Sequence, residues 1–82
     1  MDIGTRIKEL RKARGMTQKE LAKKTSLSIA SIQGYEQKKY KPKLNTIAKI
    51  AVALDVLLLD LVDTDDPILQ NEITAILAIV FN

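Results

Sequence analysis

The 82-residue chain contains no cysteine, no histidine and no tryptophan. Without cysteine it forms no disulfide and no thiolate metal site, and without histidine it lacks the side chain most used for proton transfer near neutral pH. A metal site would have to rest on carboxylates alone. Three glycines and two prolines provide few helix breakers. These absences argue against an enzyme and favour a small helical domain without metal or cofactor.

Long hydrophobic runs are also missing. The longest nearly apolar stretch, residues 73–81, is about half as long as a membrane-spanning helix. The first residues, MDIGTRIKEL, contain no apolar segment after a basic patch, so they do not form a secretory signal. The composition, 46% hydrophobic and 28% charged, is typical of one small folded domain. We therefore expect a cytoplasmic protein without membrane association.

Basic and acidic side chains are unevenly divided along the chain, so that its first part has few acidic residues and its last part has no basic ones. Residues 1–49 hold all 13 lysine and arginine side chains and four acidic ones, a net charge of +9. Residues 50–82 hold no basic side chain and six acidic ones, a net charge of −6. This asymmetry indicates one surface for a polyanion and a second segment with a different task. The alternative is a solubilising surface that is merely uneven.

Hydrophobic spacing predicts helices along the whole chain. Ile3, Ile7, Leu10 and Ala13 fall on one face of a first helix, and Gly15 stands where a glycine commonly ends a helix.

A capping box predicts the start of a second helix at Thr17. The Thr17 hydroxyl is expected to accept from the Glu20 amide, and the Glu20 carboxylate from the Thr17 amide. This helix ends near residues 25–26. Ser28 is then the predicted N-cap of a third helix that runs to about Gln37.

Three more helices are predicted after a basic loop, residues 38–43. A fourth helix begins near residue 43, and a short fifth helix covers residues 58–62. We expect these core residues in helices two to four: Leu21, Ala22, Ile32, Leu44, Ile47, Ile50, Ala51 and Leu54.

The polar segment 63–67 is the predicted domain boundary, with Asp66 as N-cap and Pro67 as the first residue of a sixth helix. Residues 1–62 then form one domain, and residues 63–82 a linker and a C-terminal helix. Asp63, Asp65 and Asp66 resemble a metal cluster, but capping and a solvated linker explain them better.

Two short helices joined by a turn of three to four residues, in a basic domain, are typical of a helix-turn-helix. The specific elements are Gly15-x-Thr17-Gln18-x-x-Leu21-Ala22, Ser28-x-x-x-Ile32-x-x-Tyr35-Glu36, Pro42-x-Leu44 and Ile50-Ala51-x-x-Leu54-x-Val56. From about residue 3 to residue 61 the sequence resembles the lambda repressor/Cro-like (XRE) family of helix-turn-helix DNA-binding proteins. The resemblance implies an all-α, five-helix lambda-repressor-like DNA-binding domain, here with an additional C-terminal helix.

The resemblance also implies a recognition helix, residues 28–37, that lies in the DNA major groove. It places five residues at the bases: Ser28, Ile29, Ala30, Gln33 and Gly34. Gln33 is the strongest candidate because its amide can pair bidentately with adenine. Gln18 is expected at a phosphate, together with the free amides at the start of its helix.

A basic cluster follows the recognition helix, where the family commonly contacts the DNA backbone. Its members are Lys38, Lys39, Tyr40, Lys41 and Lys43. Such contacts give affinity without sequence information and a strong salt dependence. In the first helix, Arg11 and Arg14 are the best candidates for further backbone contacts. Glu36 is expected to pair with a nearby base such as Lys39, and Tyr35 to be partly buried.

Three residues depart from the family pattern. Gly34 lies inside the recognition helix, where the family usually has a polar or basic side chain, and Ser26 and Lys38 replace two usual glycines. Ile29, Ala30 and Gly34 together leave the base-facing side of this helix poor in hydrogen-bonding groups, which predicts modest sequence discrimination or recognition of DNA shape.

The sixth helix is hydrophobic on more than one face, so we expect it to have two partners. One is the body of the domain, through Leu58 and Leu61, and the other a second copy of the chain. The predicted dimer interface consists of Leu69, Ile73, Ile76, Leu77, Val80 and Phe81. The alternatives are a helix absorbed in the monomer core and a surface that binds a toxin or a regulatory peptide.

These observations predict sequence-directed binding of double-stranded DNA by a homodimeric transcriptional regulator, in this family usually a repressor. Two-fold symmetry would place the two recognition helices on a palindromic operator. The alternative function is an antitoxin-like protein that masks a partner protein and regulates its own expression.

Overall fold

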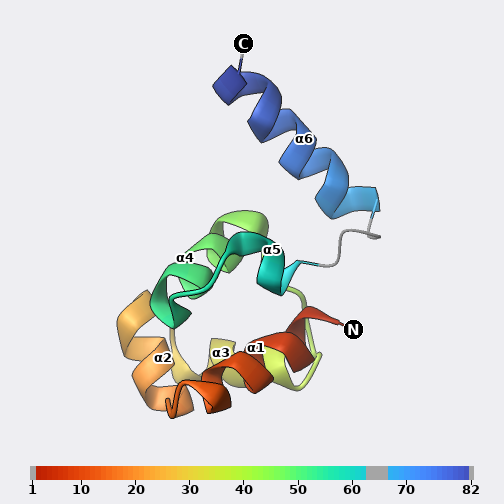
Figure 1. Ribbon diagram of the computed structural model, residues 1–82. Coiled ribbons are helices and arrows are strands. Elements are labelled where there is room, and N and C mark those ends of the chain that lie inside the picture. Colours follow the sequence, from red (N-terminus) through yellow and green to blue (C-terminus); the bar gives the residue numbers. More distant parts are fainter. Residues whose placement is uncertain (1, 63–66, 82) are drawn as a thin grey trace.

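A computed structural model describes residues 2–62 and 67–81 of the chain. The described residues form six α-helices and their connections, which confirms the predicted all-α class (Figure 1). The helices are α1 (Ile3–Ala13), α2 (Gln18–Thr25), α3 (Ile29–Glu36), α4 (Leu44–Leu54), α5 (Leu58–Leu61) and α6 (Pro67–Phe81). Helices α1 to α5 pack into one body, and α6 extends beyond it (Figure 1).

The core of the five-helix body is aliphatic. Its most deeply buried side chains are Ile7, Leu21, Ile32, Ile47, Ile50, Leu54 and Leu61. All core residues predicted for α2, α3 and α4 are buried. In α1 the prediction was wrong for Ala13, which is exposed, whereas Arg11 is buried. Arg11 follows Ile7 by one helical turn, so it continues the inward-facing stripe of α1.

Asp2 caps the first turn of α1. Its Oδ1 accepts a hydrogen bond from the Thr5 amide at 2.9 Å, and its Oδ2 accepts one from the Thr5 hydroxyl at 3.0 Å. Lys38 Nζ lies 3.1 Å from Oδ2, which connects the start of α1 with the basic loop. The Thr5 amide and then Lys38 favour the carboxylate and lower the pKa of Asp2 to about 2.

We expect the Asp2 carboxyl to titrate at about pH 2 in the folded protein, followed by NMR. Because this pKa lies below the ordinary value of 3.8, ionised Asp2 stabilises the fold at higher pH, and the stabilisation is lost as the pH falls through the folded pKa. Lys38→Met should raise the pKa only in part, since the Thr5 amide remains. An ordinary pKa in the wild type would show that the cap is absent in solution.

Left-handed backbone follows each of the first four helices. Gly15 has a φ of 65°, as predicted for a glycine that ends α1. Ser26 after α2, Lys38 after α3 and Asp55 after α4 have φ values of 60°, 63° and 56° although they carry side chains. Ser26 and Lys38 are two of the positions where the sequence departs from the family pattern, and here that departure introduces backbone strain.

Ser26→Gly is expected to raise the free energy of unfolding by about 0.5–1 kcal/mol. Glycine adopts the left-handed conformation without the steric cost, and its greater freedom in the unfolded chain offsets part of the gain. Thermal unfolding measures this as an increase of a few degrees in Tm. Lys23→Gly, an exposed change inside α2, serves as control and should destabilise by about 1 kcal/mol. An equal decrease in the free energy of unfolding for Ser26→Gly and Lys23→Gly would contradict the prediction.

Helix α6 begins at Pro67, as predicted. Ile76, Leu77, Ile79 and Val80 are exposed, with between 47% and 80% of their surface accessible. Three other residues of the predicted interface, Leu69, Ile73 and Phe81, lie outside the residues whose side chains the structure describes. Leu61 is buried and belongs to the core of the five-helix body, and its predicted contact with α6 stays a prediction.

The predicted domain boundary and the three aspartates suggested as a metal cluster lie between residues 63 and 66, outside the described residues. In residues 2–62 and 67–81, no three potential metal ligands come together. Over the same residues, no helix combines the length and hydrophobicity that crossing a membrane requires.

Candidate nucleic-acid interface

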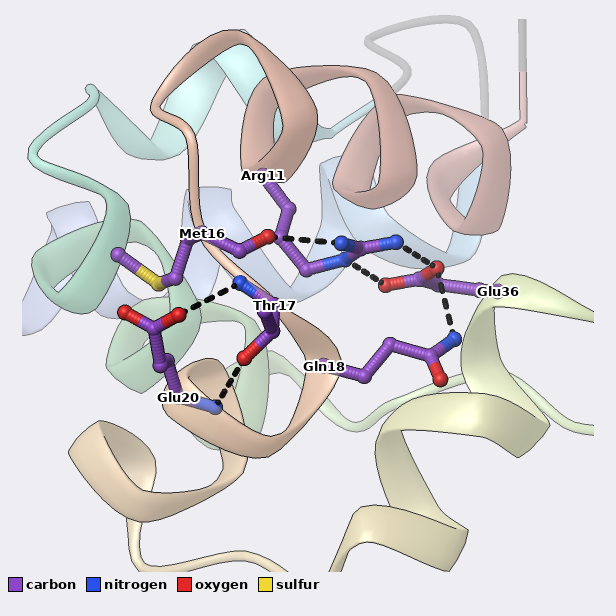
Figure 2. Close-up of polar contacts among 6 residues, drawn as sticks. All are labelled: Arg11, Met16, Thr17, Gln18, Glu20 and Glu36. Atoms are coloured by element: carbon purple, nitrogen blue, oxygen red, sulfur yellow. Dashed lines mark hydrogen bonds and ion pairs between the residues drawn. The ribbon is translucent and has the colours of Figure 1, made fainter.

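The start of α2 is built by the predicted capping box. The Glu20 amide donates to Thr17 Oγ1 at 3.0 Å, and the Thr17 amide donates to Glu20 Oε1 at 3.3 Å (Figure 2). An α-helix leaves its first amides without intrahelical acceptors, and the box satisfies those of Thr17 and Glu20. The amides of Gln18 and Lys19 therefore point out of the helix end, where the helix dipole favours an anion such as a phosphate.

A tight turn joins α2 to α3. The Leu27 amide donates to the carbonyl oxygen of Ala22 at 3.0 Å, across the left-handed Ser26. Ser28 then caps α3, because its Oγ accepts from the Ser31 amide at 3.0 Å. The predicted cap is confirmed. Together these bonds fix the direction in which α3 leaves the turn.

One side of α3 faces solvent. We call its exposed residues Ser28, Ile29, Ala30 and Gln33 the recognition face. The opposite side of the helix carries Ile32, which is completely buried in the core. All four were predicted to face bases, and the structure leaves them accessible. The Ser28 hydroxyl is engaged in the cap and shares a 2.8 Å hydrogen bond with the Ser31 hydroxyl.

Gly34 does not belong to the recognition face, so its prediction as a base-facing residue was wrong. It is buried, and a Cβ at this position would overlap the ring of Tyr40. The reason is a contact that is not local in sequence, since Tyr40 belongs to the loop after α3. That loop covers Gly34 and leaves the neighbouring turn of α3 open.

A buried ion pair connects α1 with the end of α3. Arg11 Nε lies 2.7 Å from Glu36 Oε2, and Arg11 Nη2 donates to Glu36 Oε1 at 2.9 Å (Figure 2). Arg11 Nη1 donates to the Met16 carbonyl oxygen at 2.8 Å. Only 9% of the Arg11 side chain and 2% of the Glu36 side chain are accessible. The Glu36 carboxylate holds the pKa of Arg11 above its ordinary value.

This pair corrects two predictions. Arg11 was expected at the DNA backbone, but its guanidinium is buried and bound to Glu36. Glu36 was expected to pair with Lys39, but it pairs with Arg11 instead. The sequence did contain a signal, because Arg11 follows Ile7 and Glu36 follows Ile32 by one helical turn. A charged residue on an inward-facing stripe indicates a buried partner.

Glu36 also orients Gln18. The Gln18 side-chain amide donates to Glu36 Oε1 at 3.2 Å, which links the start of α2 to the end of α3 (Figure 2). The predicted phosphate ligand is therefore held by a carboxylate of the neighbouring helix. Its half-exposed side chain and the amides of the α2 N-terminus lie next to the recognition helix.

The basic loop, residues 38–43, supplies the positive charge. The side chains of Lys38, Lys39, Lys41 and Lys43 are exposed. Lys38 pairs with Asp2, so its charge is partly compensated. Tyr40 is half exposed, and its hydroxyl donates to the Ala30 carbonyl oxygen at 3.2 Å. This hydrogen bond holds the loop beside the recognition face.

Arg14 lies apart from this group. It is exposed, and its Nη2 donates to the Asp55 carbonyl oxygen at the end of α4, at 3.0 Å. The structure thus brings Gln18, the recognition face and the basic loop together around α3, and it gives Arg14 a contact with α4.

Comparisons with known proteins agree with this arrangement. The family model for helix-turn-helix domains matches residues 7–61. An immunity repressor of Bacillus phage phi105 is 41% identical over 56 residues, which are 68% of this chain and 39% of that protein. An uncharacterized HTH-type transcriptional regulator of Archaeoglobus fulgidus is 44% identical over 62 residues, 76% of this chain and 89% of that protein.

A solved structure shares the fold. It is the restriction-modification controller protein C.AhdI from Aeromonas hydrophila, with a TM-score of 0.71 and 35% sequence identity over 73% of this chain and 91% of that one. The match to the phage repressor covers less than half of that relative's length. The family match covers most of this chain and coincides with α2, the turn and α3 as the structure places them. The chain therefore belongs to the lambda repressor/Cro-like (XRE) family of helix-turn-helix proteins.

Proposed function

We propose that this chain binds double-stranded DNA in a sequence-directed manner and acts in the cytoplasm as a transcriptional regulator, in the first place as a repressor. One observation carries the proposal. The uncharged recognition face belongs to α3, which contacts the open N-terminus of α2 through Gln18 and the basic loop through Tyr40. This is the arrangement a helix needs to enter the major groove while its flanks meet the two phosphate walls.

Different side chains suit base contacts and phosphate contacts. Gln33 is suited to an adenine edge, and Ile29 and Ala30 to thymine methyl groups. Gln18 and the first amides of α2 suit one phosphate wall, and the loop lysines the other. The names of the relatives support regulation, since one is a phage immunity repressor and another a restriction-modification controller protein.

Selection of bound fragments from sheared genomic DNA tests this function. Fragments retained at near-physiological salt are sequenced and compared with the input. We expect an enriched inverted repeat with half-sites about 10–11 base pairs apart, because a two-fold dimer presents its recognition helices about one DNA turn apart. Retention without enrichment, lost uniformly as salt rises, would show binding to the backbone alone and contradict the proposal.

We further propose that α6 forms the homodimer. Ile76, Leu77, Ile79 and Val80 expose a continuous apolar surface on this helix. A surface of this kind marks a protein interface in a water-soluble chain. The division of the chain into a DNA-binding domain and a dimerisation element after residue 62 is part of this proposal.

Ile76→Asp is expected to convert a dimer to a monomer at micromolar concentration, because it places a carboxylate in an apolar interface. Sedimentation velocity measures the change, and affinity for the palindromic site should fall with it. Thr74→Asp, on the same exposed helix, adds the same charge at a residue that is already polar and should remain dimeric. A wild type that sediments as a monomer would contradict the dimer and favour a different protein on α6, as in the antitoxin-like alternative.

A further inference from the structure

Tyr40 belongs to the basic loop, but its side chain turns back onto α3. Its hydroxyl donates to the Ala30 carbonyl oxygen at 3.2 Å, and Ala30 is part of the recognition face. Its ring meets the ring of Tyr35 edge-on, with centroids 5.3 Å apart and planes at 83°. Aromatic pairs favour this T-shaped geometry. Tyr40 therefore joins the loop to the turn of the helix that carries the recognition face.

The Tyr40 ring packs directly against Gly34. A Cβ on Gly34 would overlap Cζ and Oη of Tyr40 and lie 2.7 Å from Cε1. Glycine weakens a helix interior, so its presence in α3 needs a compensating contact. The close approach of Tyr40 is that contact. The glycine at position 34 of the recognition helix thus leaves the space that the Tyr40 ring of the basic loop occupies.

We propose that Tyr40 is a positioning residue that fixes the basic loop against the recognition face, so that phosphate contacts and base contacts form as one unit. The first residues of the loop are already attached, because the amides of Gln37, Lys38 and Lys39 donate to the carbonyl oxygens of Gln33, Tyr35 and Gly34. Tyr40 extends this attachment to the residues that follow. The proposal rests on DNA binding through α3.

The effect should concentrate on the specific complex. At its own site the protein must satisfy base edges and phosphates in one geometry, and a loop ordered beforehand loses less freedom on binding. On an unrelated duplex, flexible lysines find phosphates at any register, because that attraction carries no sequence information. Tyr40 therefore contributes to discrimination without contacting a base.

The Tyr40 ring can move away from Gly34 without unfolding α3. Tyr40 borders a surface hollow of about 370 Å³ whose lining also includes Asp2, Ile3, Gly4, Tyr35, Lys38, Lys39 and Lys41. The three atoms nearest to a methyl group on Gly34 would all belong to the far end of this side chain. Gly34→Ala should therefore displace Tyr40 and otherwise favour the helix, since alanine has the higher helix propensity.

The test is a double-mutant cycle of Gly34→Ala and Tyr40→Ala. Fluorescence anisotropy measures affinity for the selected site and for an unrelated duplex of equal length. Each single variant should lose roughly tenfold on the selected site and less than about twofold on the unrelated duplex. The double variant should lose no more affinity for the selected site than the single variant with the larger loss, because both changes remove the same contact. The Tm of Gly34→Ala should equal or exceed that of the wild type.

Additive losses would overturn the proposal, because they would mean that Gly34 and Tyr40 act on DNA separately. Amide hydrogen exchange in the free protein gives a readout independent of DNA. Exchange at residues 40, 41 and 43 should be faster in Gly34→Ala than in the wild type, and unchanged exchange would also overturn the proposal. A wild type that does not distinguish the two duplexes would instead overturn the proposed function, while the exchange data still decide the role of Tyr40.

Discussion

Glu36→Ala is expected to lower the free energy of unfolding by about 3–5 kcal/mol. The reason is that the Arg11 guanidinium stays buried without its carboxylate, and that Gln18 loses its acceptor as well. A domain of this size has a total stability of only about 5–10 kcal/mol, so the variant should lose a large part of it and unfold at a much lower temperature than the wild type. Urea denaturation followed by circular dichroism measures the loss.

Two controls separate burial of charge from loss of a side chain. Glu20→Ala removes an exposed carboxylate from the capping box and should cost about 0.3–1 kcal/mol. The double variant Arg11→Met with Glu36→Leu replaces the pair by apolar side chains and should recover most of the stability, since neither charge is then left alone. A cost for Glu36→Ala no greater than that for Glu20→Ala would contradict the buried pair.

Gln33→Ala is expected to weaken binding to the selected DNA site by about 1–3 kcal/mol, or roughly 5- to 150-fold. Gln33 is exposed on the recognition face, where its side-chain amide is suited to two hydrogen bonds with one base. Affinity for an unrelated duplex and the salt dependence should stay unchanged, because no charge is removed. Anisotropy titrations against sites with single base-pair changes should show that discrimination is lost at one position of each half-site.

Lys39→Ala is the matched control for Gln33→Ala. It removes an exposed charge from the basic loop, so its affinity should fall by a similar factor on every sequence. The slope of log affinity against log salt should become shallower by about one for each lost phosphate contact. An equal loss on selected and unrelated DNA for Gln33→Ala would show that Gln33 does not read bases.

The helices of this domain were predictable because their signals are local. Thr17 and Ser28 each mark the start of a helix through a capping signal that spans only four residues of sequence. Gly15 marks the end of the first helix. The aliphatic residues then repeat with a helical period, which is enough to assign the inner face of each helix. The residues of the recognition face were predicted from the family resemblance alone.

The errors share one physical cause. Arg11 and Gly34 were assigned by residue type and family position, whereas their roles depend on contacts with residues outside their own helices. Arg11 meets Glu36, which is 25 residues away, and Gly34 is covered by Tyr40 of the following loop. Neither contact follows from periodicity, since periodicity places residues on faces and does not say which faces meet. In both cases a residue that breaks the local pattern indicated a partner outside its own helix.

The absence of free charge on the recognition helix has a consequence for how the protein chooses among sites. From Ile29 to Glu36, α3 has no basic side chain, and its one acid is neutralised by Arg11. Ions in the medium therefore act on the flanks, through the loop lysines, and leave the reading of bases nearly untouched. When ionic strength drifts in a cell, the occupancy of all sites should rise or fall together while their order of preference is kept. Such a protein separates how much DNA it holds from which DNA it prefers.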